Sequence, residues 1–193
     1  TNQGQTAPLE LSRVLVLPDK MRIDATIQSP DGPRVLSVGV TDAAAWKRIP
    51  DPRTNNYVVV DITGDGLAAA GFERWREPDL ILLKAADPAA RLTPAPDETI
   101  DGKSYAVVRL RAPLGEVDVS LYIDKKTKLI GRMSYSDGGN VENDDFSDYR
   151  DVGGVAFAYK RTSAGDGRST SLELKTVEVD PQVDAALFAK PAR

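Results

Sequence analysis

Apolar and polar side chains alternate along most of this chain. The stretch MRIDATIQ places Met21, Ile23, Ala25 and Ile27 on one side and polar or charged residues on the other. A period of two is typical of a β-strand with one buried face and one wet face. Turn signals bound the stretch on both sides, LPDK before it and SPDGP after it. The segment is therefore predicted to be a strand.

The same pattern recurs from one end of the chain to the other. The first half contains LELSRVLVL, MRIDATIQ, RVLSVGVT and NNYVVVDI, and the second half contains SYAVVRLRA, EVDVSLYID, KLIGRMSYS, DDFSDYRDV, VAFAYKRTS and RSTSLELKTVEVD. Links such as PLGE, DKKTK, DGGN and AGDG are too short for a parallel crossover. The sequence predicts about ten antiparallel strands.

Helical patterns are confined to short segments. In residues 64–87, Asp65 is expected to cap a helix through Leu67–Trp75, and Pro78 suits the first turn of a second helix through Ala85. A third short turn is expected after Asp180, through Leu187. The stretch ARLTPAPDE between these helices and the second group of strands is predicted to be a proline-rich loop.

A long antiparallel sheet twists and curls, and its apolar face needs cover. The pattern therefore predicts a mainly β (α+β) fold. We expect a curved antiparallel sheet, an open half-barrel whose concave face two or three short helices cover. A closed barrel is the alternative.

Several segments resemble the bacterial lipoprotein carriers LolA and LolB and their relatives. VLPDKMRIDA is similar to their strand–proline–strand step, and VTDAAAW to their hairpin ending in Trp, with Ala in place of the usual Gly. VSLYIDKKTKLIGRMSYS, DFSDYRDVGGVAFAYK and the ending VDPQVDAALFAKP are similar to the later strands and the terminus of that group. The resemblance covers nearly the whole chain, residues 1–193, as a single domain.

This resemblance implies an apolar cavity in a domain of the bacterial periplasm or cell envelope. The ligand it implies is apolar, an acyl chain or a lipidated protein, with peripheral membrane contact as a further partner. Similar domains also follow insulinase-type zinc peptidase domains, so an accessory C-terminal domain with no ligand of its own is the alternative. The start TNQGQTAPLE, polar and without Met, predicts a mature product or part of a longer chain.

Composition narrows the chemistry. The 193 residues include no His and no Cys, which removes Ser–His and Cys–His nucleophile pairs and the zinc motifs built on these residues. Basic residues number 25 against 29 acidic, without a basic block, which argues against nucleic-acid binding. A non-catalytic chain without a cofactor is predicted.

Two acidic segments are candidates for metal binding. ENDDFSDYRDV, residues 142–152, does not place oxygen ligands at calcium-loop spacing, and a charged edge strand or bulge is the preferred interpretation. DITGDG matches the first positions of a calcium loop, but Phe72 occupies the closing position that needs a bidentate carboxylate. No metal site is therefore predicted.

Large apolar side chains near the helical region are the candidates for ligand contact. They are Trp46, Phe72, Trp75, Leu80 and Leu83. An ordinary hydrophobic core uses the same residue types and is the alternative. Arg22 lies on the predicted outer side of its strand and is assigned no ligand role.

Overall fold

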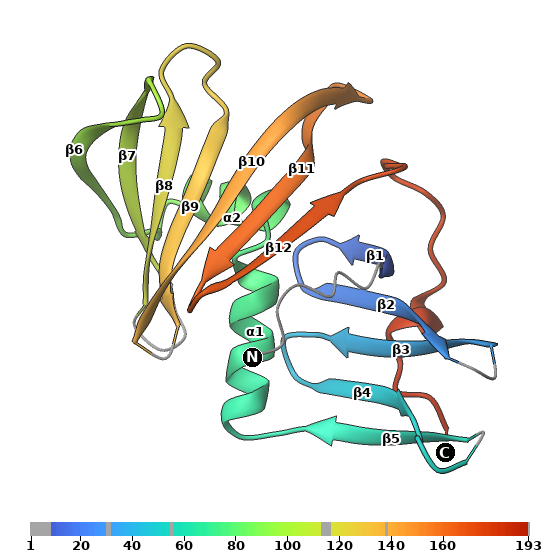
Figure 1. Cartoon of the computed structure of the whole chain (residues 1–193). Coiled ribbons are helices and arrows are strands. Elements are labelled where there is room, and N and C mark those ends of the chain that lie inside the picture. Colours follow the sequence, from blue (N-terminus) through green and yellow to red (C-terminus); the bar gives the residue numbers. More distant parts are fainter. Residues whose placement is uncertain (1–8, 30–31, 55, 113–116, 138, 193) are drawn as a thin grey trace. The chain divides into compact units, whose positions relative to one another are not determined.

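The computed structural model describes residues 9–29, 32–54, 56–112, 117–137 and 139–192, and is mainly antiparallel β-structure (Figure 1). The chain forms two compact units. The first joins the residues up to Leu80 with the C-terminal segment from Val183, and the second is Ile81–Gln182. Each unit has a sheet of its own, and the single-domain organisation stays a prediction.

The first unit is built on a five-stranded sheet in which every strand pairs with its sequence neighbour. Its strands are β1 (Glu10–Val16), β2 (Lys20–Ser29), β3 (Gly32–Val40), β4 (Ala45–Pro50) and β5 (Tyr57–Ile62). All pairs are antiparallel, as the short turns between them require.

The register of these strands separates two faces. Met21 lies opposite Val40, Val40 opposite Ala45, and Ala45 opposite Ile62, so these residues share one face. We call it the inner face, and the face that carries Arg22 the outer face. The apolar residues of the inner face are Leu11, Leu15, Met21, Ile23, Ala25, Ile27, Leu36, Val38, Val40, Ala45, Ile49, Val58, Val60 and Ile62.

Helix α1 (Asp65–Trp75) covers one end of the inner face. Its side chains Leu67 and Ala70 pack against a core of Met21, Val40 and Ala45. In Figure 1 the helix runs across the end of the sheet where β5 leads into it. Burial of these apolar side chains holds the helix on the sheet, since a helix of this length is marginal alone.

The C-terminal segment covers the outer face. The 3₁₀ turn η1 (Ala185–Phe188) brings backbone carbonyls to Trp46 and Arg22, which lie on this face. The Trp46 ring lies directly over Gly39 of the neighbouring strand, where a Cβ atom would be 2.5 Å from the ring. Segments of the first unit thus contact both faces of the five-stranded sheet, and α1 covers only one end of the inner face.

The second unit is a seven-stranded antiparallel sheet with the order β12-β11-β10-β9-β8-β7-β6. Its strands are β6 (Leu92–Ile100), β7 (Lys103–Arg111), β8 (Asp118–Asp124), β9 (Ile130–Asp137), β10 (Asn140–Val152), β11 (Val155–Gly165) and β12 (Arg168–Glu173). Helix α2 (Pro78–Ala86) precedes it and includes the boundary between the units.

The predicted antiparallel, mainly β fold is confirmed, with twelve strands among the described residues in two open sheets rather than a closed barrel. Two strands were missed. Residues 45–50 form β4, and most of the predicted proline-rich loop forms β6. Strand β6 lies at the sheet edge and has a bulge between Ala95 and Glu98, a position where Pro94 and Pro96 are tolerated.

Three local predictions were wrong. Asp65 is the first residue of α1, whose N-cap is Gly64 without a side-chain hydrogen bond. The last helical turn begins later than expected, because the Asp184 carboxylate accepts a hydrogen bond from the Ala186 N–H and caps it. The acidic stretch 142–152 belongs to β10, an inner strand of its sheet, although pairing with β9 ends at Asp145 and the residues after it pair with β11 alone.

Candidate functional site

The inner face of the five-stranded sheet has a covered end and an uncovered end. At the covered end Met21, Val40 and Ala45 are at most 3% exposed beneath α1. At the other end Leu11, Ile27 and Val58 are 45%, 41% and 44% exposed. Leu11 and Val58 lie on the two edge strands and Ile27 on β2, so the exposed apolar residues are spread across this end of the face. A surface with several exposed apolar residues marks a binding site more often than a single exposed residue does.

The positions of the strand ends explain why Leu11, Ile27 and Val58 lie at the same end of the sheet. Antiparallel pairing places the start of β1, the end of β2 and the β4–β5 turn at the same end of the sheet (Figure 1). Helix α1 begins at the opposite end, after Ile62. Its eleven residues span about 16 Å at 1.5 Å per residue, too short to cover a sheet face of five strands in both directions.

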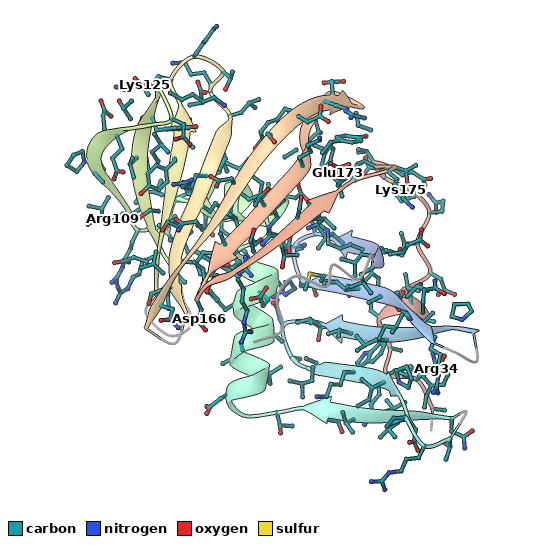
Figure 2. The ribbon with its side chains drawn as sticks, viewed as in Figure 1. Arg34, Arg109, Lys125, Asp166, Glu173 and Lys175 are labelled. Atoms are coloured by element: carbon teal, nitrogen blue, oxygen red, sulfur yellow. The ribbon has the colours of Figure 1, made fainter. Side chains whose placement is uncertain are left out.

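The cations of the inner face belong to Arg13, Arg34 and Lys47, by register. Arg34 is tied to the β4–β5 turn, where its guanidinium donates to the carbonyls of Asp51 and Asn56 at 2.8 and 2.6 Å. Figure 2 shows Arg34 near the start of β3, at the end of the sheet where this turn lies. Arg34 therefore has a structural role in holding the turn.

Arg13 binds the junction of the two helices. Its guanidinium donates to the Glu77 carboxylate and, at 3.1 Å, to that of Asp79. Burial raises the pKa of Asp79 above its ordinary value, against the opposing effect of Arg13, and the charge of Glu77 raises it further. The cluster joins edge strand β1 to the segment that follows α1.

Lys47 differs from both arginines. It lies on β4 opposite Val38 of β3 and Val60 of β5, and its side chain is exposed. No ion pair of Lys47 is found within the described part of the chain. The inner face thus carries one unneutralised ammonium group amid valines.

The residues predicted to contact a ligand are not brought together as one group. Trp46 lies on the outer face, where its indole Nε1 donates to the Phe188 carbonyl at 3.0 Å. The Arg22 guanidinium lies 5.6 Å from the centre of its ring. Trp46 is therefore on the opposite side of the sheet from α1, and Arg22 is on the outer face as predicted.

The other four residues belong to the helices. Phe72 and Trp75 stack in α1 with ring centres 6.1 Å apart, and Trp75 is 7% exposed. In α2, Leu80 is buried whereas Leu83 is 50% exposed. Contact of these side chains with a ligand stays a prediction.

The seven-stranded sheet contains a buried polar group that sequence reasoning missed. Asp144 is fully buried and lies opposite Met133 in β9, although its acidic sequence neighbourhood predicts exposure to solvent. Its carboxylate accepts from Arg161 at 2.8 Å and from Ser163 Oγ at 2.5 Å. Both partners lie on β11, so only the strand pairing could have identified them.

Neither a metal-site cluster nor a membrane-spanning helix is found in the described ranges. No cluster of three or more acidic side chains among these residues has the geometry of a metal site. None of the helices in the same ranges has the length and apolar character needed to span a bilayer.

The sequence signal for Lys47 was present but missed. AWKRIP alternates, with Ala45, Lys47 and Ile49 on one face, and the lysine interrupts an otherwise apolar series. Because this short strand follows TDAA directly, its pattern alone indicates no more than one arm of a hairpin. Pairing of β4 with both β3 and β5 assigns Lys47 to the inner face.

No protein-family model matches the sequence, and no curated protein matches it significantly. Three solved structures do match, each over 94% of this chain. A domain from Vibrio parahaemolyticus described as an outer membrane lipoprotein-sorting protein has a TM-score of 0.64, with 14% identity over 81% of its length.

The other two structures have lower TM-scores. A LolA superfamily protein from Nitrosomonas europaea has a TM-score of 0.55, with 13% identity over 87% of its length. A DUF1329 family protein from Desulfovibrio piger has a TM-score of 0.54, with 14% identity over 86% of its length. At these identities the likeness concerns the fold, and the chain has the LolA-like fold that the sequence resemblance predicted.

Proposed function

We propose that this chain is a non-catalytic, lipoprotein-carrier-type domain of the bacterial cell envelope. In this proposal an acyl chain, free or attached to a protein, binds at the uncovered end of the inner face. The observation that carries it is the exposure of Leu11, Ile27 and Val58 on one face of one sheet. The LolA-like fold supports it.

The energetics favour weak, reversible binding. Each buried methylene contributes roughly 0.8 kcal/mol, so eight methylenes contribute about 6 kcal/mol before the cost of immobilising the chain. Much of that gain is lost on ordering the ligand, and micromolar to millimolar affinity is expected. Such an affinity suits a carrier, which must release its cargo.

A fluorescent fatty-acyl probe, titrated below its micelle concentration, tests the proposal. Intrinsic Trp46 emission is a poor reporter, because its ring lies on the outer face. We expect saturable probe binding that Ile27→Glu and Val58→Glu weaken at least tenfold, since each places a charge in the apolar site. Gln28→Glu is the matched control, because Gln28 is exposed on the outer face of the same strand.

Two results would count against acyl binding. One is absence of saturable binding by the wild-type chain. The other is equal weakening by Gln28→Glu and Ile27→Glu, which would show a general charge effect. The accessory-domain role beside a larger peptidase, with no ligand of its own, would then be the better explanation.

A further inference from the structure

The inner face is mostly apolar, and the charged side chains on its strands are all cationic. Among the described strand residues, the register places three cationic side chains on this face and no carboxylate. Acidic strand residues such as Asp24 and Asp61 lie on the outer face instead. The strands of the inner face therefore present positive charge only, and the carboxylates of Glu77 and Asp79, which lie beside this face, are both bound to Arg13.

Two of the three cations are already engaged. Arg13 binds the carboxylates of Glu77 and Asp79, and Arg34 binds backbone carbonyls of the β4–β5 turn. Lys47 has neither kind of partner within the residues that the structure describes. Its ammonium group has three donors to offer.

The position of Lys47 relative to the exposed patch suits an amphiphile. Lys47 lies two residues along β4 from Ala45, which belongs to the covered core. Ile49 lies two residues beyond Lys47, opposite Val58 on β5. Positions i and i+2 along a strand are about 6.6 Å apart. When the head group contacts Lys47, the acyl tail can lie along the inner face over Val58 and Ile27, which are farther from the covered end.

We propose that the inner face selects a single-chain amphiphile with an anionic head, a carboxylate or a phosphate, and that Lys47 contacts this head. The inference rests on the proposed acyl binding and names the class of ligand. An inward-pointing lysine also discourages strand addition near a sheet edge. A lysine that only prevents strand addition predicts no preference for anionic over neutral ligand head groups. Ligand binding can therefore distinguish this role from head-group recognition.

Competition against the fluorescent probe tests the choice of head group. Dodecanoate, dodecyl phosphate and methyl dodecanoate share one tail length and differ in the charge of the head. The wild-type chain should bind the better anionic ligand about fivefold more tightly than the neutral ester, the range of a partly exposed ion pair. High salt should reduce this preference.

Lys47→Gln should abolish the preference and leave the affinity for the ester unchanged. Lys47→Arg should keep it, because the charge remains. Lys126→Gln removes one positive charge from an exposed turn of the other unit and should change nothing. Melting temperatures of all three variants check that each is folded.

The outcomes separate the two proposals. If none of the ligands binds, acyl binding fails and the anionic preference with it. If all three bind equally, acyl binding stands and the anionic preference is overturned. A preference that survives in Lys47→Gln also overturns the assignment to Lys47. The relative affinities of dodecanoate and dodecyl phosphate identify which anion the site takes.

Discussion

The indole Nε1 of Trp46 donates a 3.0 Å hydrogen bond to the backbone carbonyl of Phe188, 142 residues along the chain. This bond fastens the C-terminal segment to the outer face of the five-stranded sheet. Phe188 is itself only 6% exposed, and the Arg22 guanidinium binds the adjacent Leu187 carbonyl at 2.7 Å. Phe188 is thus part of the first unit's core.

Phe188→Ala should therefore lower the free energy of unfolding by about 3 kcal/mol, since a buried aromatic ring is lost and a cavity remains. In a Trp75→Phe background, the remaining Trp46 emission should shift to longer wavelength. Chemical denaturation and fluorescence measure both effects. The control Leu83→Ala, at a 50% exposed position, should change stability by less than about 0.5 kcal/mol.

Gly39→Ala should destabilise the chain by about 1–3 kcal/mol, because the added Cβ would lie 2.5 Å from Trp46 Cε2. Trp46→Leu removes the ring and should make Gly39→Ala nearly neutral in the same background. A double-mutant cycle from urea denaturation gives the coupling. Additive losses would show that the close approach of these two residues does not limit the substitution.

Asp144→Leu should cost about 3–5 kcal/mol, because it leaves the half-buried Arg161 charge without its carboxylate. The double variant Asp144→Leu with Arg161→Met replaces the pair with apolar groups and should be more stable than the single variant. Asp145→Asn is the matched control, since Asp145 pairs with Arg132 near the surface and such pairs contribute about 0–1 kcal/mol. Equal losses in Asp144→Leu and Asp145→Asn would contradict the assignment.

Asp79 provides a pH test. Its pKa is raised in the fold, chiefly by burial, so its ionisation disfavours the folded state. This penalty is absent below the ordinary value of 3.8 and grows as the pH rises through the folded pKa. Asp79→Asn should therefore be more stable than wild type at neutral pH, and the difference should vanish in acid.

Unfolding curves at several pH values measure this difference. Asp166→Asn, in the exposed β11–β12 turn, corrects for the loss of one negative charge (Figure 2). If Asp79→Asn is less stable than wild type at neutral pH, the bond from Arg13 outweighs the cost of burying the Asp79 charge, and the prediction is wrong.

The period of two was sufficient to predict ten of the strands, because side-chain alternation is a local property. It failed for β4 and β6. Strand β4 has six residues, among them Lys47 on its apolar side, and β6 contains Pro94 and Pro96. In both cases pairing with a neighbouring strand outweighs weak local preference.

The candidate site was harder to predict because it depends on contacts distant in sequence. Alternation identifies two faces of a strand but not which segment covers each. The assignment of Trp46 to the face beneath η1 depends on Phe188, and the burial of Asp144 depends on Arg161. Neither partner lies within the window that a periodic pattern spans.

The two prolines of β6 have a consequence for self-association. Strand β6 ends the seven-stranded sheet, and an outermost strand is where a second molecule could add by main-chain pairing. Pro94 and Pro96 contribute no N–H group, and the irregular pairing between Ala95 and Glu98 interrupts the flat edge. The edge formed by β6 therefore resists pairing with further molecules into fibrils. Pro94 and Pro96, which made this strand look like a loop in the sequence, are the residues that prevent such pairing.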